Sequence, residues 1–295
     1  MKIHHLNCGS VRTIDATYDG PAAAPAVNHC LLVETDRDGL VLVETGLGLG
    51  DVRDPEGTLG ADWIEMAAPV LDEDETAVRQ VARLGFDPSD VRHILLTHLD
   101  VDHCGGLPDF PDADVHVLAD ELAAAHAGTA SGRYRPAHWA HGPRWVTYES
   151  GTGAESGAGA RVRAPEDWFG FGSFRPRGLP PEFRLVPLGG HTAGHTGIAV
   201  DRGDRWLLHC GDAYYYHREM GDAKEPHPLL DVVQTGSEVH RDLRLGTQAR
   251  LRELVREHGD RVELFSAHDP WEYARLAGAA GAAGAAGAAG AAEAA

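Results

Sequence analysis

The sequence predicts an α/β fold in which two β-sheets lie between layers of helices. Apolar runs of strand length fall into two groups, one before residue 120 and one after residue 180, and helical patterns are interleaved with both. With 295 residues, of which 43% are hydrophobic, the chain is long enough to bury a large core. No linker separates the two groups, so we expect one domain over residues 1–276.

The first group of strands comes from four apolar runs that contain valines, at residues 27–34, 40–44, 91–96 and 111–118. The sequence Asp-Arg-Asp-Gly at 36–39 predicts a hairpin turn between the first two runs. A helix is expected at 74–84, where apolar residues share one face and a glycine follows the last turn. A second helix is expected at 122–126.

The second group of strands is predicted at residues 183–188, 197–201, 205–209 and 262–266. A helix at 248–258 precedes the last of these strands. From residue 277 to 295 the chain repeats Gly-Ala-Ala and lacks large apolar side chains, so we expect a disordered tail there.

Residues 128–180 interrupt the regular pattern with an aromatic-rich insert that shows neither helical nor strand period. A long irregular insert is usually functional or disordered, and its aromatic content favours a wall or lid over a site. His141, Arg144 and Trp145 are therefore candidate substrate contacts, with a place on the surface as the alternative. Trp168 and Phe171 would line an apolar pocket or hold the insert against the domain.

The composition excludes several classes of partner. A net charge of −19 disfavours nucleic acid, because phosphate contacts usually require Lys or Arg. The four cysteines form no CxxC pair, so no disulfide framework is expected, and Cys104 and Cys210 are expected to be small buried hydrophobes. The N-terminus lacks the apolar core of a signal peptide, and no run of about 18 apolar residues occurs. We therefore expect a cytoplasmic protein without a membrane span.

The most informative segment is residues 97–106, Thr-His-Leu-Asp-Val-Asp-His-Cys-Gly-Gly, which follows an apolar strand. Carboxylate oxygen and imidazole nitrogen are ligands of zinc, iron and manganese. Two pairs of such side chains would each face one metal: His98 with Asp100, and Asp102 with His103. A solvated acidic turn is the alternative, which four ligand-type residues in six positions and the following glycines disfavour.

These residues resemble the signature of the metallo-β-lactamase fold superfamily, T-H-x-H-x-D-H, which reads T-H-L-D-V-D-H in this chain. Later segments follow in the family's order: G-H-T-A-G-H at 190–195, H-C-G-D at 209–212 and S-A-H-D at 266–269. The upstream V-E-T-G at 43–46 is similar to the family's D-T-G turn, with Glu in place of Asp. The resemblance covers about residues 27–270. It implies a four-layer αββα sandwich of two mixed β-sheets, with the site at one sheet edge.

The resemblance also implies a dinuclear metal site with seven ligands. The first metal would be held by His98, Asp100 and His191, the second by Asp102, His103 and His268, with Asp212 bridging the two. Two divalent ions, with zinc as the first expectation, would share a hydroxide that attacks an acyl carbon. Asp102 would orient this nucleophile or accept a proton. His195 resembles a histidine that supports the site by hydrogen bonding.

Asp100 departs from the family pattern, which has histidine at this position. A carboxylate adds a negative charge and is a harder ligand, so the preference would shift toward iron or manganese. Flavodiiron proteins of the same superfamily carry a carboxylate at this place and bind iron. Three interpretations stay open: zinc held through the carboxylate, iron or manganese, and a first site that no longer functions.

Within the superfamily, the chain is most similar to the N-acyl homoserine lactone lactonases. Their D-A-x-Y segment is matched by Asp-Ala-Tyr-Tyr at 212–215, which would make Tyr215 the hydrogen-bond donor to a developing oxyanion. Packing is the alternative role, because three consecutive tyrosines make a chance match easy.

This resemblance implies a hydrolase of lactones or related carboxylic esters that acts on a small molecule as a monomer or homodimer. A glyoxalase II-like thioesterase is the alternative, although no basic cluster for an anionic thiol carrier occurs near the C-terminus. A flavodiiron-like redox protein is disfavoured because no flavin-binding domain follows.

Overall fold

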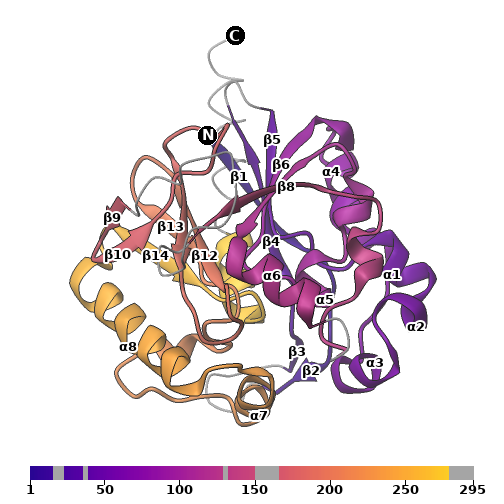
Figure 1. Cartoon of the computed structure of the whole chain (residues 1–295). Coiled ribbons are helices and arrows are strands. Elements are labelled where there is room, and N and C mark those ends of the chain that lie inside the picture. Colours follow the sequence, from indigo (N-terminus) through magenta and orange to yellow (C-terminus); the bar gives the residue numbers. More distant parts are fainter. Residues whose placement is uncertain (16–22, 36–38, 129–131, 150–165, 279–295) are drawn as a thin grey trace, which may run out of the picture.

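The computed structural model describes residues 1–15, 23–35, 39–128, 132–149 and 166–278. Two β-sheets pack face to face, and helices cover the outer face of each sheet (Figure 1). This four-layer arrangement is the predicted αββα sandwich. In the described part of the chain, no helix has both the length and the apolar surface needed to cross a bilayer.

The first sheet has six strands in the order β1-β4-β5-β6-β7-β8. These strands are β1 (Lys2–Asn7), β4 (His29–Glu34), β5 (Leu40–Val43), β6 (Val91–Leu95), β7 (Asp114–Leu118) and β8 (Arg144–Tyr148). Strands β1, β4 and β5 pair antiparallel, and β5 to β8 pair parallel. The parallel strands end at the same edge of the sheet, which is where loops of α/β proteins usually carry their sites.

The second sheet has four strands in the order β11-β12-β13-β14. They are β11 (Phe183–Pro187), β12 (Thr196–Asp201), β13 (Trp206–His209) and β14 (Val262–Phe265). Strands β11, β12 and β13 are antiparallel, whereas β13 and β14 are parallel. Two small pairs of strands flank the sheets: β2 (Thr13–Ile14) with β3 (Ala24–Pro25), and β9 (Glu166–Trp168) with β10 (Phe171–Ser173).

The helices lie outside the sheets. They are α1 (Leu49–Arg53), α2 (Pro55–Thr58), α3 (Ala61–Ala67), α4 (Ala77–Arg83), α5 (Val101–Cys104), α6 (Ala119–Ala127), α7 (Pro228–Ser237) and α8 (Arg241–His258). A further helix runs through residues 270–278. Short 3-10 turns are η1 (Glu73–Glu75), η2 (Pro88–Asp90), η3 (Leu107–Asp109), η5 (Pro136–Trp139) and η6 (His217–Met220).

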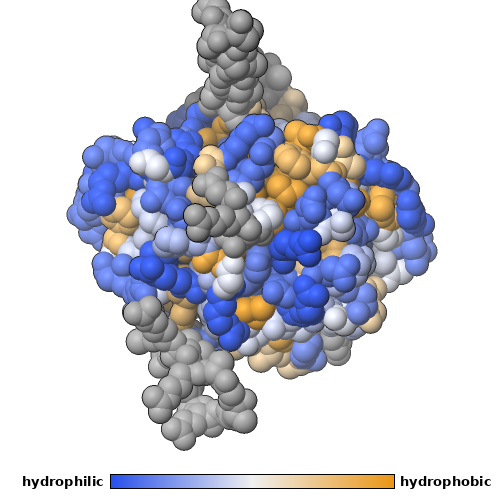
Figure 2. Space-filling model, turned by 90° about the horizontal axis from the view of Figure 1, so that it is seen from above, coloured by the Kyte–Doolittle hydropathy of each residue, from blue (hydrophilic) through white to orange (hydrophobic). Residues whose placement is uncertain are grey.

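Alternation along the strands explains why two cores form, since successive side chains of a strand point to opposite faces. Leu31 and Val33 of β4 lie in the core between the two sheets. Cys30 and Leu32 of the same strand lie in the core under α4 and α6. A third core holds the second sheet against α8. The end of the molecule at the top of Figure 1 is largely hydrophilic among the described residues (Figure 2).

Most of the predicted elements are confirmed, with boundaries that differ by a few residues. The helix expected from residue 248 begins earlier, at Arg241, and the strand expected from 111 begins at Asp114. Strand β1 and helices α1, α2, α3 and α7 were not anticipated. The turn expected at 36–39 and the Gly/Ala tail lie largely outside the described residues.

The insert at 128–180 differs from its expected irregular form. Part of it is β8, which extends the first sheet by pairing with β7 in parallel register. The stretch at 150–165 lies outside the described residues. Trp168 and Phe171 are buried against the second sheet, so they hold the insert to the domain and do not line a pocket. The sequence of β8 does not show a clear alternation of apolar and polar residues. It is an edge strand of only five residues, Arg and Thr among them, and most of its side chains are half-buried.

Candidate metal centre

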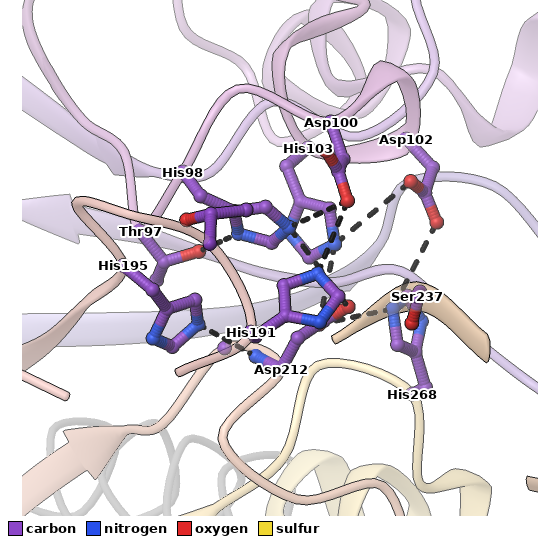
Figure 3. A network of polar contacts seen from close by, with 12 residues as sticks. Thr97, His98, Asp100, Asp102, His103, His191, His195, Asp212, Ser237 and His268 are labelled. Atoms are coloured by element: carbon purple, nitrogen blue, oxygen red, sulfur yellow. Dashed lines mark hydrogen bonds and ion pairs between the residues drawn. The ribbon is translucent and has the colours of Figure 1, made fainter. Parts of the chain in front are cut away.

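All seven predicted metal-ligand residues lie together at one end of the two sheets. His98 and Asp100 follow β6, and Asp102 and His103 lie on α5. His191, Asp212 and His268 lie on loops after β11, β13 and β14. Figure 3 shows the first four approaching from one side and the other three from the opposite side.

The loop after β6 is shaped by its apolar anchors and glycines. Leu96 and Leu99 are fully buried, so the polar residues between and after them turn toward the second sheet. Gly105 follows α5, and a Cβ there would lie 2.1 Å from a carboxylate oxygen of Asp51. A Cβ on Gly106 would lie 2.9 Å from the carbonyl oxygen of Thr45. Only glycine allows this close approach of backbones beside the cluster.

The first cluster consists of His98, Asp100, His191 and one oxygen of Asp212. Asp100 Oδ2 lies 3.3 Å from His98 Nε2 and 3.1 Å from His191 Nε2. Asp212 Oδ2 lies 3.4 Å from His191 Nε2 and 3.9 Å from His98 Nε2. Ligand atoms around one tetrahedral zinc ion are separated by roughly 3.3 Å, given bonds of about 2.0 to 2.1 Å. The spacing is therefore that of a single metal site.

The second cluster consists of Asp102, His103, His268 and the other oxygen of Asp212. Asp212 Oδ1 lies 3.3 Å from His103 Nε2 and 3.1 Å from His268 Nε2. The Asp102 carboxylate lies 3.9 Å from His103 Nε2 and 3.8 Å from His268 Nε2. Asp212 thus directs one oxygen to each cluster, which is the placement of a bridging carboxylate.

Unpartnered polar atoms at the centre of the site fit metal ions. The Nε2 atoms of His98 and His103 and the Oδ1 atom of Asp212 are buried and have no hydrogen-bond partner among the described residues. Buried polar atoms nearly always have partners, so unpaired nitrogen and oxygen atoms that converge on one place fit the ligand set of a metal ion. Groups of His and Asp suited to a metal cover all seven predicted residues.

The outer nitrogens of three histidines are held by the protein, which leaves Nε2 directed at the site. The partners of Nδ1 are Thr97 Oγ1 for His98 (2.8 Å), Glu44 Oε2 for His103 (2.6 Å) and the Val27 carbonyl for His268 (2.9 Å). Such outer contacts set the tautomer and orientation of a ligand ring.

Glu44, in the turn that resembles the family's D-T-G motif, supports the site from behind. Its Oε1 accepts a hydrogen bond from the Thr97 backbone N–H, and its Oε2 faces His103. Burial lowers the pKa of His103, but the carboxylates of Asp212 and Glu44 outweigh it and raise the net pKa well above 6.5. Glu44 therefore holds both the backbone at Thr97 and the ring of His103 in place.

Glu121, which the sequence did not single out, joins the two ligand loops. Its Oε1 accepts hydrogen bonds from the Leu99 N–H (3.0 Å) and the Tyr134 hydroxyl (3.3 Å). Its Oε2 accepts from the Thr192 hydroxyl (2.6 Å) and the Gly194 N–H (3.1 Å). Leu99 is next to two predicted ligands and Thr192 next to a third, so Glu121 fixes both loops relative to each other.

Arg133, from the insert, was also missed and reaches the first cluster. Its Nε and Nη2 donate to the two oxygens of Asp100 at 2.6 and 2.7 Å. Nη2 also lies 2.7 Å from His191 Nε2, and Nη1 donates to the Ser237 carbonyl at 2.6 Å. Burial raises the pKa of the Asp100 carboxyl, but the Arg133 charge outweighs it and holds that pKa well below 3.8.

Tyr215 and His195 both contact the bridging residue Asp212. The Tyr215 hydroxyl donates to Asp212 Oδ2 at 2.8 Å, and its side chain is buried. His195 Nε2 accepts a hydrogen bond from the Asp212 backbone N–H at 3.0 Å, while its Nδ1 faces the Leu188 carbonyl at 2.9 Å. His195 therefore supports the site through the backbone, as its motif implied.

A cavity of about 730 Å³ opens onto the cluster between α3 and α7. Its floor includes Asp100, Asp102, Arg133, Asp212, Tyr215 and His268. Its walls are largely apolar and include Ile14, Trp63, Leu230 and Val233. A pocket of this size, with polar groups converging at its base, suits a small organic molecule.

The three candidate substrate contacts of the insert lie elsewhere. Arg144 and Trp145 belong to the edge strand β8, where Arg144 pairs with Asp114 at 2.8 Å. His141 lies on the exposed turn before this strand. None of these three described residues is among those that line the cavity. We therefore assign the substrate pocket to other residues.

The two cysteines near the ligands are buried, as expected. Cys104 and Cys210 have no solvent exposure, and burial raises the pKa of both thiols well above 9.0. The Cys104 thiol faces the Leu99 carbonyl at 3.4 Å, and that of Cys210 faces the Leu208 carbonyl at 3.7 Å. Both pack as small apolar side chains.

Comparisons with known proteins agree with this geometry. The family model of the metallo-beta-lactamase superfamily matches residues 24–256. A probable metallo-hydrolase of Mycobacterium tuberculosis is 42% identical over 275 residues, covering 92% of this chain and 81% of that protein. The N-acyl homoserine lactonase AttM of Rhizobium johnstonii is 39% identical over 117 residues, which is 40% of each chain.

Solved structures with low sequence identity share the fold. A variant of B. thuringiensis AiiA with N-decanoyl-L-homoserine bound at the active site has a TM-score of 0.65 at 21% identity, covering 92% of this chain and 94% of that chain. AidC, a dizinc quorum-quenching lactonase, has a TM-score of 0.52 at 16% identity, covering 84% and 74%. The two-sheet sandwich is thus confirmed, and its His/Asp site is typical of a dimetal hydrolase of that superfamily.

Proposed function

Because this chain belongs to the metallo-beta-lactamase superfamily, we propose that it is a dinuclear metal-dependent hydrolase that opens a lactone or a related carboxylic ester. The observation that carries the proposal is Asp212, whose two oxygens face separate histidine clusters at the floor of an apolar cavity. Similarity to named lactonases over part of the chain favours lactones within the ester class.

The proposed ligands are those that the two clusters bring together. His98, Asp100 and His191 hold the first ion, Asp102, His103 and His268 hold the second, and Asp212 bridges. Zinc is the first candidate, and the carboxylate of Asp100 keeps iron and manganese as alternatives. Two divalent ions bound there would supply Lewis acidity toward a carbonyl and a water of lowered pKa.

Two side chains of this protein would orient the ester and accept the proton released by the attacking water. The Tyr215 hydroxyl lines the floor of the cavity and donates to Asp212 Oδ2; rotation of its single O–H toward the cavity would let it donate instead to the carbonyl oxygen as negative charge develops there. Asp102 lines the same cavity beside His103 and His268, and its carboxylate would accept the proton that the attacking water releases. The apolar walls would hold the hydrocarbon part of the substrate and exclude water.

The first test of this proposal measures proton release from a panel of substrates. The panel contains acyl homoserine lactones, simple lactones, aryl esters and acyl thioesters, offered to protein loaded with Zn²⁺, Mn²⁺ or Fe²⁺. Preferential turnover of lactones supports the proposal. Turnover of thioesters alone would assign the protein to the glyoxalase II-like branch. No turnover of any compound by protein that carries two metals would refute the ester class.

Two substitutions test the assigned roles. Asp212→Ala is expected to lower metal content and abolish hydrolysis, whereas Asp204→Ala, at a side chain that is 66% exposed, should change neither. Tyr215→Phe is expected to lower kcat by about 100- to 1000-fold with little effect on KM, in line with the loss of one oxyanion donor. Tyr214→Phe is the matched control, because the Tyr214 hydroxyl bonds Glu272 on the other side. Equal activity of both tyrosine variants would refute the role of Tyr215.

A further inference from the structure

Arg133 and Asp100 form an ion pair inside the first cluster. The guanidinium binds both carboxylate oxygens, and the side chains of Arg133 and Asp100 are only 21% and 16% exposed. A bidentate arginine–carboxylate pair is among the stronger and more specific polar contacts in proteins. The pair carries no net charge, so it has the same formal charge as the neutral histidine that the superfamily usually places at position 100.

Arg133 is itself held firmly. Its third nitrogen donates to the carbonyl of Ser237, the last residue of α7. The C-terminal end of a helix carries partial negative charge and favours a cation. The guanidinium is therefore fixed between Asp100 and α7, on the side of the cluster that faces the cavity.

Arg133 also competes for a ligand atom of the first site. Its Nη2 lies 2.7 Å from His191 Nε2, and a neutral imidazole has one acceptor nitrogen with one lone pair. That lone pair cannot accept from Arg133 and bind a metal at the same time. Filling the first site therefore requires Arg133 to release His191, while its contact with Asp100 can persist because each carboxylate oxygen has a second lone pair.

The second site has no arginine or lysine beside its carboxylate Asp102 among the described residues. The ion-pair neighbours of Asp102 are His103 and His268. His103 Nε2 has no hydrogen bond to lose. Asp102 therefore meets an incoming cation without an arginine beside it, whereas the charge of Asp100 is already paired with Arg133.

We propose that Arg133 is the counter-ion of Asp100, and that by neutralising this carboxylate and occupying His191 it makes the first site bind its metal more weakly than the second. The two sites then fill in a fixed order, with the second site occupied first. This inference rests on the proposed ligand set, but it does not depend on which ester the protein hydrolyses.

The test is a Zn²⁺ titration of the metal-free full-length chain against a chromophoric chelator, which reports the affinity of each bound equivalent without a substrate. Wild-type protein is expected to bind one equivalent tightly and a second at least about tenfold more weakly, a difference of about 1.4 kcal/mol. Asp102→Ala should remove the tight equivalent, and Asp100→Ala the weak one. Two equal affinities in the wild type would overturn the proposal.

Variants at Arg133 identify the cause of the difference. Arg133→Met should strengthen the weak equivalent by about tenfold and leave the tight one unchanged, because it removes both the charge and the competitor for His191. Arg133→Lys keeps the charge and should stay closer to wild type. Arg144→Met, at an exposed arginine of the edge strand, is the matched control. An Arg133→Met protein that retains the wild-type difference between the two equivalents would overturn the proposal.

A second set of variants keeps the test decisive if Arg133→Met folds poorly. Asp100→His restores the superfamily's usual ligand but leaves the Arg133 charge beside the metal sites without its carboxylate counter-ion, so this variant is expected to lose the weak equivalent. Adding Arg133→Met to Asp100→His should restore it. If Asp100→His alone binds two equivalents as well as the double variant does, Arg133 is not the counter-ion.

Discussion

Replacing Glu121 by alanine would remove a buried carboxylate that ties the two ligand loops together. The Leu99 and Gly194 N–H groups would lose their acceptor in a buried setting, at about 1–3 kcal/mol each. The hydroxyls of Tyr134 and Thr192 can rotate toward other acceptors. Burial raises the pKa of Glu121, which shows that the buried charge is itself unfavourable. Removing this charge therefore offsets part of the lost hydrogen-bond free energy. We expect a net loss of about 2–4 kcal/mol, a large share of the 5–15 kcal/mol typical of a domain.

The assay is urea unfolding of the metal-free protein followed by far-UV circular dichroism, together with metal content after dialysis against buffered Zn²⁺. Glu121→Gln keeps the volume and one acceptor, so it should lose roughly half as much stability as Glu121→Ala. Glu253→Ala, at a side chain that is 58% exposed, should stay within about 0.5 kcal/mol of wild type. A loss below about 1 kcal/mol for Glu121→Ala, with metal content unchanged, would refute the role of Glu121 as the joint between the loops.

Three further predictions concern single positions. Glu44→Gln should weaken Zn²⁺ binding by about 10- to 100-fold in the same titration, because His103 loses its charged partner; unchanged affinity would contradict this. Gly190→Ala should lower Tm, because a Cβ there would lie 2.3 Å from a backbone nitrogen of α8. Gly203→Ala is the control: this glycine also has a positive φ, but its Cβ would meet open space, so the variant should lower Tm less. Burial raises the pKa of Glu272 from 4.5 to about 8, so its contribution to stability is fully present below pH 4.5 and is lost as the pH rises through 8. Glu272→Gln should flatten that dependence in urea unfolding at pH 5–8.5, and an unchanged slope would contradict it.

Local patterns in the sequence were sufficient for most of the strands. Buried strands such as β4 and β5 have nearly continuous apolar runs, because both of their faces are covered. Strand β1 begins the chain with two histidines among its six residues, and its partial burial hides the pattern. The short helices α1, α2 and α3 have too few turns to show a helical period. Strand β8 is short and lies in the insert, and its pairing with β7, about 30 residues earlier in the chain, is not encoded locally.

The candidate ligands were predictable because their chemistry is local. Four of them lie within six residues after one strand. Each of the other three follows a strand of the second sheet, in motifs that occur in the family's order. Glu44 and His195 could also be identified from the sequence, because each lies within one of the motifs that resemble the family.

By itself, the sequence indicated the fold class and the seven candidate His and Asp ligands that the structure brings together. Only the tertiary structure decided which residue neutralises the Asp100 carboxylate and which residue holds the two ligand loops together. Arg133 is 33 positions from Asp100 along the chain, and Glu121 is 71 positions from Thr192. The tertiary structure also decided that α3 and α7 form the walls of the cavity in place of the aromatic insert. Charge pairing and cavity shape depend on distances between segments that are remote along the chain, and no local periodicity encodes those distances.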